Sequence, residues 1–391
     1  MADVGILVDR DGPLTRAAVL TDGRLTDLYI DRADRPSLLG SIFLGRVERI
    51  ATGLDAAFID LGTGKSGLLA ASDARGPKGR VERIGTLLRT GQSVLVQVKA
   101  DAAGAKGPTL TMDVTLPGRF LVHAPLARGI SVSKRLAQGP ARAELLRRLE
   151  PVLVGEGWIA RAGAADAPPD VLLAEADALT LAWRAVQQTS ATAQAPVRLR
   201  SGLDAPQRAL IEHGTPTRIT ADGKELAAEL ARWCADFAPD LAGRIDTHLG
   251  SPGLFEMHDL DSELALLLGT RVPLSAGGSL VIERTEALTV VDVNAGERGN
   301  ALDVNLEAAR EIARQMRLRN VGGIVVVDFV NMKGRGEAER LLNALSAAVA
   351  ADPAQTQVYG MSRLGLVELT RARRGTALAD LLAPDVMGDS A

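Results

Sequence analysis

Two aspartates stand in apolar segments at positions where they could hold a divalent cation. Asp292 follows the run LTVV, and Asp328 follows GGIVVV. Burying such a carboxylate without a partner is costly, whereas two carboxylates from neighbouring strands can share a cation. Mg²⁺ prefers one or two carboxylates together with water and phosphate oxygens. Asn294 lies on the same strand face as Asp292 and could orient a carboxylate, a water or a phosphate. The spacing alone also allows a structural role, in helix caps or salt bridges at loop ends.

The segments around these aspartates predict an α/β region in the last third of the chain. GSLVIERTEALTVVDVNAG predicts two consecutive strands, and NLEAAREIARQMRLR predicts an amphipathic helix. GGIVVVDFVNM is almost continuously apolar, which is typical of a strand covered on both faces. GEAERLLNALSAAVAAD then predicts a second helix, and QTQVYGMS a further strand.

The first two thirds of the chain predict strands, a small barrel and a mixed segment. The Asp-Gly pairs at 11–12 and 22–23 are hairpin signals. Five short strands between residues 39 and 116 suit a closed barrel of OB type, and in the last of them, TLTMDVTL, apolar and polar residues alternate. Helical stretches and strand-like runs then alternate up to about residue 203.

Length and composition indicate a folded protein of several domains. At 391 residues the chain should divide into two to four domains. Its single cysteine, Cys234, excludes an internal disulfide and any zinc site built from paired cysteines. No run reaches the roughly 18 apolar residues that a membrane span needs. The N-terminus lacks a basic and then apolar signal pattern, so we expect a cytoplasmic protein without a membrane span.

The formal net charge is -3, which by itself argues against a nucleic-acid partner. The charge is unevenly distributed, however. Residues 38–116 carry ten Lys and Arg against seven Asp and Glu, and residues 305–375 carry eleven against seven. We therefore expect a polyanion, if one binds, to bind these two windows, although ordinary solvated faces often show excesses of this size.

Several motifs together resemble the ribonuclease E/G family. TEALTVVDVNAG followed by NLEAA is similar to the catalytic signature of that family, and EIARQMRLRNVGGIVVVDFVNM and SRLGLVELTRAR continue it. SIFLGRVERIATGLDAAFIDLG resembles the family's OB-fold RNA-binding module. The resemblance extends from about Ile6 to Arg373 and is densest from Pro273 onward.

The resemblance implies an α+β multidomain architecture. An RNase H-like domain would contain an inserted OB-fold barrel and a 5′-sensor domain, and a DNase I-like α/β catalytic domain would follow. The implied ranges are 1–37 and 204–272 for the RNase H-like domain, 38–116 for the OB module, 117–203 for the sensor-like domain, 273–383 for the catalytic domain and 384–391 for a tail.

The resemblance also implies a reaction. Asp292 and Asp328 would hold a catalytic Mg²⁺, with Asn294 assisting them. The substrate would be single-stranded, A/U-rich RNA, cut to 5′-phosphate and 3′-hydroxyl products during rRNA or mRNA processing or decay. The alternative is a non-catalytic RNA-binding protein on the same scaffold. Glu286 and Glu307 fall in matching segments, where supporting salt bridges are the simpler role.

Four further residues match RNA-binding positions of the family. Phe58 would stack on an RNA base, and Lys106 would contact the bound strand. Lys134 and Arg135 match a basic pair near the RNA path. The alternatives are a buried core position for Phe58 and ordinary surface charge for the pair. Leu68 stands where some relatives carry a second aromatic residue, so the platform is expected to be weaker.

The family's pocket for a 5′-monophosphate is only partly present. Gly118, Val122 and Arg161 match it, whereas Ala162 replaces the expected threonine and Gln355 the expected arginine. Another basic residue, such as Arg128 or Arg198, could have taken over that role. The Cys-Pro-x-Cys segment that links family subunits through zinc is also missing, so a zinc-linked dimer is not expected; an oligomer built on other contacts stays open.

Overall fold

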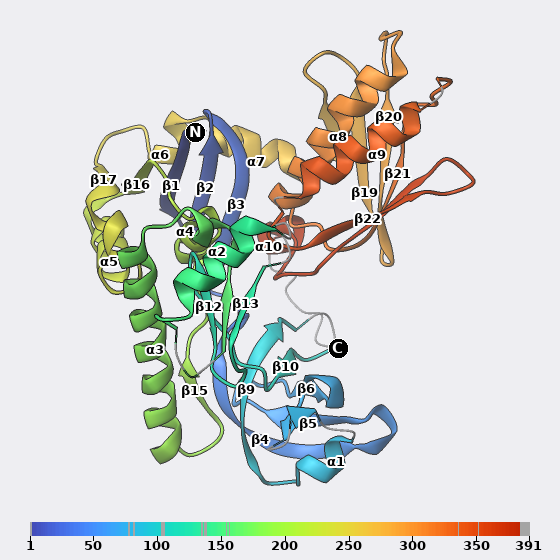
Figure 1. Cartoon of the computed structure of the whole chain (residues 1–391). Coiled ribbons are helices and arrows are strands. Elements are labelled where there is room, and N and C mark those ends of the chain that lie inside the picture. Colours follow the sequence, from blue (N-terminus) through green and yellow to red (C-terminus); the bar gives the residue numbers. More distant parts are fainter. Residues whose placement is uncertain are drawn as a thin grey trace, which may run out of the picture. The chain divides into compact units, whose positions relative to one another are not determined.

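The computed structural model describes residues 2–383, except 77, 78, 81, 82, 103–105, 134, 135, 137, 138, 154, 156, 335 and 351. The expected tail, 384–391, therefore lies outside the described residues. The described chain forms sheets of five, six, four and six strands and a two-stranded ribbon (Figure 1). It divides into two compact units, Met1–Ala17 with Asp31–Leu249, and Ala18–Ile30 with Gly250–Ala391. Every helix among the described residues is too short or too polar to cross a bilayer.

The first sheet combines strands from the N-terminus with strands that follow residue 204. Its order is β17-β16-β1-β2-β3, and β16 pairs in parallel with both β1 and β17. Asp22 and Gly23 turn the chain between β2 and β3 with φ of 50° and 77°, as a two-residue hairpin turn requires. This confirms the hairpin predicted there. The strands are β1 Val4–Asp11, β2 Leu14–Thr21, β3 Arg24–Arg32, β16 Arg218–Asp222 and β17 Ile245–His248.

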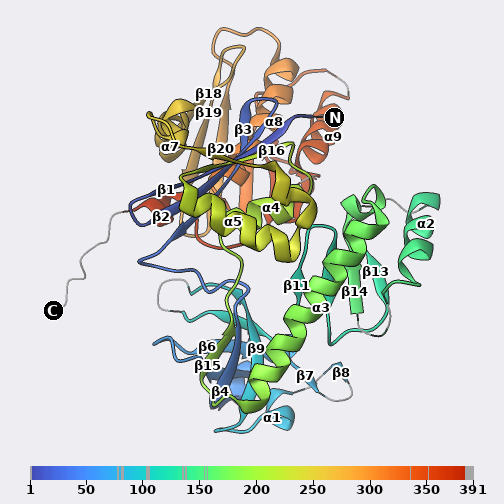
Figure 2. The same ribbon diagram turned by 90° about the vertical axis from the view of Figure 1, so that its left-hand side faces the viewer.

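Two helices pack on this sheet within the first unit. Helix α4 (Ala205–His213) contacts β1, and α5 (Lys224–Phe237) contacts β16 and β17 (Figure 2). Asp204 caps α4 by accepting a hydrogen bond from the Gln207 amide, and Pro206 stands in the first turn, where its missing N–H costs nothing. The sheet thus joins the two ranges expected to form one RNase H-like domain; that label itself stays a prediction.

A closed barrel of five strands follows, as predicted for residues 38–116. The order is β4-β5-β6-β10-β9, and β9 pairs back onto β4. Phe43, Ile59 and Leu110 belong to the buried core of the barrel. The strands are β4 Ile42–Ala51, β5 Ala56–Asp60, β6 Gly67–Ala70, β9 Ser93–Ala100 and β10 Thr109–Thr111, and the ribbon β7 Arg75–Gly76 with β8 Gly79–Arg80 and helix α1 Ile84–Leu87 lie between β6 and β9.

The last barrel strand is shorter than the run TLTMDVTL predicts. Strand β10 ends at Thr111, because the Thr111 hydroxyl accepts a hydrogen bond from the Asp113 amide and bends the chain. Such side-chain bonds to nearby backbone compete with the ladder of a sheet. Outside the barrel, β15 (Val197–Arg200) pairs with β4.

The segment between the barrel and β15 forms a small sheet packed against helices. Its order is β11-β12-β14-β13, and its core includes Leu121, Trp158 and Trp183. Glu175 of α3 is buried here and accepts hydrogen bonds from the amides of residues 119, 120 and 121. The elements are β11 Leu116–Pro117, β12 Leu121–Ala124, β13 Ile130–Val132, α2 Pro140–Leu149, β14 Gly157–Ala160 and α3 Pro169–Thr192.

The second unit contains the sheet that carries Asp292 and Asp328. Its order is β18-β19-β20-β21-β23-β22, and β20 and β21 run parallel. Helices α8 and α9 pack on each other, and their apolar sides share one core with Val291, Val293, Val325 and Val327. The elements are α6 Leu254–Met257, α7 Leu260–Leu268, β18 Arg271–Pro273, β19 Ser279–Arg284, β20 Leu288–Asn294, α8 Ala301–Leu318, β21 Gly323–Asp328, α9 Glu337–Val349, β22 Thr356–Met361, β23 Val367–Arg371 and α10 Leu378–Leu382.

The expectation that the strand GGIVVVD is covered on both faces is wrong. Val325 and Val327 are fully buried under the helices, whereas Ile324 on the opposite face is 50% exposed. The apolar run suggested cover on both faces of the strand, but α8 and α9 pack on a single face. The other face of β20 and β21, with Val290, Ile324 and Asp328, is open in the described structure, and we call it the open face of this sheet.

Candidate active site and RNA-binding surface

Asp292 and Asp328 lie side by side across two parallel strands. They are register partners on β20 and β21, so both side chains stand on the open face. Adjacent strands of a sheet lie about 4.8 Å apart, which brings the two carboxylates within reach of one cation. Both residues are exposed. The sequence analysis expected the two aspartates on neighbouring strands. The register of β20 and β21 places them directly opposite each other.

Asn294 fixes the orientation of one of these carboxylates. Its Nδ2 donates a hydrogen bond of 2.7 Å to Oδ2 of Asp292, and both side chains point to the same face of β20. Among the described residues, neither aspartate forms an ion pair with Lys or Arg, and neither caps a helix. The structural alternatives that the spacing allowed, salt bridges or caps, therefore do not account for the pair.

The donor set suits a hard divalent cation. Two adjacent carboxylates repel each other unless a cation or a proton lies between them. In the described part of the chain, no group of three or more His, Cys, Asp or Glu side chains comes together at a site. Two carboxylates with water and phosphate oxygens match Mg²⁺, whereas a structural zinc site needs four ligands of its own.

Asn305 is a residue that the sequence analysis missed. It lies fully buried on α8, and its Nδ2 donates to the Val330 carbonyl at 2.8 Å while its Oδ1 accepts from the Val330 amide at 3.0 Å. Val330 follows Asp328 by two residues, so Asn305 holds the chain where it leaves the carboxylate pair. The signal in the sequence was an asparagine on the buried arc of an amphipathic helix.

Glu307 has a structural role in this region. Its carboxylate pairs with Arg298 at 2.5 Å and accepts hydrogen bonds from the Ser275 hydroxyl and the Ala276 amide. Burial alone would raise the pKa of Glu307, but the bonds from Ser275 and Arg298 lower it to about 2. The ion pair ties α8 to the loop that follows β20, and the bonds from Ser275 and Ala276 tie it to the loop that follows β18. Glu286, the other glutamate in a matching segment, is exposed.

Phe58 lies on the outside of the barrel, on the strand between β4 and β6. Its neighbours Ala57 and Ile59 point into the core, whereas Phe58 is only partly buried. Arg49 and Leu68 are its register partners on β4 and β6, and the Arg49 guanidinium carbon is 4.2 Å from the Phe58 ring centre. We call Arg49, Phe58 and Leu68 the barrel platform. The buried-core alternative for Phe58 does not hold.

Lys106 lies near one end of this platform. It is exposed and precedes β10, whose Thr109 is the register partner of Leu68. The Leu68 amide donates to the Pro108 carbonyl, so the chain after Lys106 follows the edge of β6. Lys134 and Arg135 lie outside the described residues.

Four of the five residues of the expected 5′-phosphate pocket come together in the first unit. Val122 on β12 pairs with Ile159 on β14, and the Arg161 amide donates to the Phe120 carbonyl at 2.8 Å. Gly118 and Ala162 lie beside these strand ends. Gln355 belongs to the second unit, where it is exposed in the turn before β22 with a φ of 58°.

The guanidinium of Arg161 is already engaged. It forms hydrogen bonds of 3.3 Å with both carboxylate oxygens of Glu212 and another with the Ile211 carbonyl. A phosphate would therefore have to compete with Glu212 for this arginine. Gly118 has a packing reason to be glycine, since a Cβ there would lie 2.6 Å from the carboxyl carbon of Glu175.

A barrel with an outward aromatic residue, and a separate sheet with a carboxylate pair, are the parts of an enzyme that acts on a nucleic-acid strand. The model of the Ribonuclease E/G family matches residues 115–374. The chain belongs to this family.

Curated relatives agree with that membership. The chain is similar to ribonuclease G of Salmonella typhimurium (strain SL1344), with 33% identity over 398 residues that cover 96% of this chain and 81% of the relative. Ribonuclease G of Escherichia coli (strain K12) matches with the same identity and coverage. Ribonuclease E of Nostoc sp. (strain PCC 7120) is 36% identical over 385 residues, which cover 93% of this chain and 55% of that longer protein.

Proposed function

We propose that this chain is an endoribonuclease that cuts single-stranded RNA with the help of Mg²⁺ held by Asp292 and Asp328. The observation that carries the proposal is the register pairing of the two aspartates on an open sheet face, with no cationic partner among the described residues. Membership of a family whose curated relatives are named ribonuclease G and ribonuclease E supports it.

In the proposed reaction, a water oxygen attacks the scissile phosphorus in line with the leaving O3′. The P–O3′ bond breaks and O3′ takes up a proton, so the products end in a 3′-hydroxyl and a 5′-phosphate. A divalent cation, when bound, supplies positive charge beside the phosphate and lowers the pKa of the attacking water. Asp292 and Asp328 hold the cation, and the hydrogen bond from Asn294 keeps Asp292 in one orientation. Asn305 positions the chain after Asp328.

The barrel platform supports a preference for unpaired bases. A base can stack on an aromatic ring only when its face is free, and such stacking contributes roughly 1–3 kcal/mol per base. The Arg49 guanidinium lies over the Phe58 ring and adds positive charge that suits a backbone phosphate beside the stacked base. A/U-rich segments expose such bases most readily, because their pairs are weaker. RNA of this kind in rRNA precursors or mRNA is the substrate class we propose, encountered in the cytoplasm.

A cleavage assay tests the proposal directly. The full chain is incubated with a 5′-labelled A/U-rich oligonucleotide, once with Mg²⁺ and once with EDTA, and the product ends are identified. We expect cleavage with Mg²⁺ alone and products that carry a 5′-phosphate. Tight binding without cleavage under both conditions would instead favour the non-catalytic RNA-binding alternative.

A further inference from the structure

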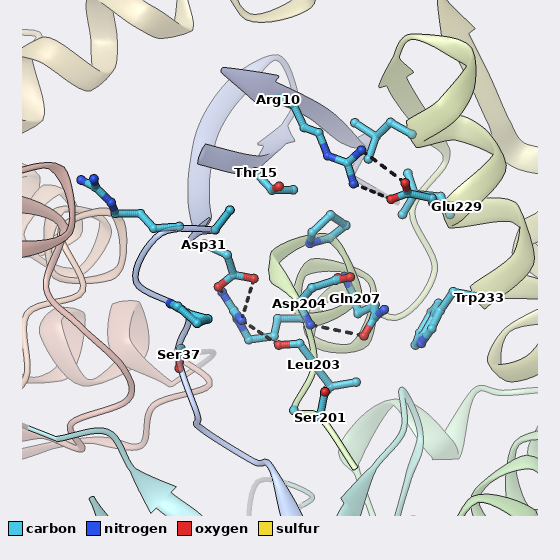
Figure 3. Close-up of a pocket in the computed structure, with 18 of the residues that line it drawn as sticks. Arg10, Thr15, Asp31, Ser37, Ser201, Leu203, Asp204, Gln207, Glu229 and Trp233 are labelled. Carbon is cyan, nitrogen blue, oxygen red and sulfur yellow. Dashed lines mark hydrogen bonds and ion pairs between the residues drawn. The ribbon is translucent and has the colours of Figure 1, made fainter. Parts of the chain in front are cut away.

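A separate cavity of about 510 Å³ lies within the first compact unit (Figure 3). Its walls come from four segments far apart in the sequence: the β1–β2 hairpin, the chain that follows β3, the connection from β15 to α4, and helix α5. Neither the barrel platform nor the carboxylate pair contributes to it. Five arginines and four hydroxyl side chains are among its lining residues, which suits a polar, anionic ligand.

Three of the five arginines in the lining are engaged with acids. Arg10 pairs with Glu229 at 2.5 Å, as Figure 3 shows. Arg208 pairs with Asp31 at 2.8 Å, and Arg32 pairs with Asp34 at 2.5 Å. The first two pairs join distant segments of the wall and neutralise Glu229 and Asp31, whereas the lining acid Asp204 caps helix α4. These three arginines therefore leave little charge for a ligand.

The two remaining arginines are available. Arg198 on β15 and Arg232 on α5 are both exposed, and within the described residues neither has an acidic partner. A guanidinium presents several N–H donors in a planar fork that matches phosphate oxygens. Two unengaged guanidinium groups at one cavity therefore form a suitable site for a phosphate.

One aromatic side chain also lines the cavity. Trp233 on α5 is partly buried and stacks on Phe237 with ring centres 5.4 Å apart. The Arg200 guanidinium carbon lies 5.5 Å from the Phe237 ring centre, which extends the stack to two residues outside the cavity lining. The indole is thus fixed in orientation from one side. An aromatic ring interleaved with arginines is a typical arrangement for stacking a base and binding its phosphate.

We propose that this cavity binds a nucleotide, with its base against Trp233 and its phosphate between Arg198 and Arg232. The hydroxyls of Thr15, Ser37 and Ser201 in the lining suit the ribose. The site is independent of cleavage and of the barrel platform. A nucleotide of an RNA strand and a free mononucleotide have the same chemistry here. Because β15 pairs with β4 of the barrel, a bound RNA strand could reach both sites.

The positions of the three tryptophans allow ligand binding at this cavity to be followed by tryptophan fluorescence. Trp158 and Trp183 are 4% and 3% exposed in the core of the sensor-like segment, and the barrel contains no tryptophan. A base that stacks on Trp233 should therefore quench the emission of this residue, whereas binding at the platform should not. The titration uses the full chain with Asp292→Asn in EDTA, so that its result does not depend on cleavage. The probes are 5′-AMP and a 5′-phosphorylated tetranucleotide of adenosine.

We expect saturable quenching by both probes and an increase in Kd of at least tenfold in Arg198→Ala/Arg232→Ala. Arg184→Ala is the matched control, because Arg184 is an exposed arginine on α3 outside the cavity, and it should leave Kd unchanged. A tetranucleotide that binds at least tenfold more tightly than 5′-AMP identifies the site as one for an RNA strand; equal affinities identify it as one for a mononucleotide. Unchanged emission with both probes, or an unchanged Kd in a double variant with a native circular dichroism spectrum, would overturn the proposal.

Discussion

The side chain of Asn305 forms two hydrogen bonds with the backbone of Val330, one through the Val330 carbonyl and one through its amide. We expect Asn305→Ala to destabilise the fold by about 1–3 kcal/mol, because the partly buried carbonyl and amide of Val330 both lose their partner. The value of kcat should fall at least tenfold while RNA affinity stays within a few-fold, since Asp328 lies two residues upstream. Asn320→Gly is the control, since Asn320 has a φ of 47° that glycine adopts without strain: it also loses bonds to backbone carbonyls, of Arg374 and Thr376, away from the carboxylate pair. Equal losses of kcat in both variants would mean that Asn305 acts through stability alone.

Asp292→Asn and Asp328→Asn should each abolish cleavage and leave RNA affinity within a few-fold. Each substitution is nearly isosteric but removes half of the negative charge that fixes the cation. Glu283→Gln serves as the control, because Glu283 is another exposed carboxylate, and its register partner Val290 stands on the same open face. Single-turnover cleavage with saturating Mg²⁺ decides the matter. Near-native rates in either aspartate variant would show that the cation is held elsewhere.

Phe58→Ala and Lys106→Ala should weaken single-strand binding more than they slow cleavage of bound RNA. Stacking and phosphate contacts hold the strand before and during the reaction, so their loss raises KM rather than lowering kcat. The lysine variant should also show a shallower dependence of affinity on salt, because one phosphate contact is lost. Fluorescence anisotropy across a salt series, combined with single-turnover rates, measures both effects. A fall in kcat with unchanged KM would contradict the platform role.

Substrates with a 5′-monophosphate and a 5′-hydroxyl should be cut at rates within about fivefold of each other. Glu212 already engages Arg161, Ala162 has no hydroxyl, and Gln355 is neutral, so few strong donors remain for a terminal phosphate. The comparison is kcat/KM on two oligonucleotides that differ only at the 5′ end. A kcat/KM for the 5′-monophosphate substrate more than roughly tenfold higher, which corresponds to about 1.4 kcal/mol, would contradict this prediction.

Removing the competing carboxylate should restore part of this preference. In Glu212→Gln the Arg161 guanidinium loses its ionic partner, and we expect the monophosphate preference to rise severalfold in the same comparison. The double variant Arg161→Ala/Glu212→Gln is the control and should return to the wild-type ratio. If the double variant keeps the increased preference, a basic residue other than Arg161 reads the 5′ end.

The Glu307–Arg298 ion pair should make stability depend on pH in the acidic range. The folded-state pKa of Glu307, about 2, lies below its usual value, so the pair stabilises the fold above the unfolded pKa. That stability is lost as the pH falls from about 4.5 towards about 2. Glu307→Gln should therefore lower Tm at neutral pH and have a progressively smaller effect below pH 4, measured by thermal unfolding. A constant difference in Tm across this range would contradict the assignment.

Sequence patterns over a few residues predicted the strands and the tight turns, which depend on neighbouring residues. The run of five short strands predicted the barrel, and Asp22-Gly23 predicted the hairpin between β2 and β3 of the first sheet, because a turn of two residues needs positive φ. The apolar run before Asp328 was misread, since sequence does not reveal that both helices pack on one face. Asn305 was missed because its partner, Val330, is 25 residues away. The cavity beside Trp233 could not be inferred either, because its walls are four segments that only the tertiary fold brings together.

Because one face of the sheet in the second unit is open, substitutions along β20 and β21 should have two different kinds of effect, depending on the face that the residue occupies. Along β20, Val291 and Val293 are buried under the helices, and the residues that alternate with them, Val290, Asp292 and Asn294, are exposed. Along β21, the same alternation separates Val325 and Val327 from Ile324 and Asp328. A saturation scan of these two strands should thus give phenotypes with a period of two. Substitutions at the buried positions should cause loss of soluble protein. Substitutions at the exposed positions should give well-folded protein, and most should be tolerated except at the positions proposed to hold the cation.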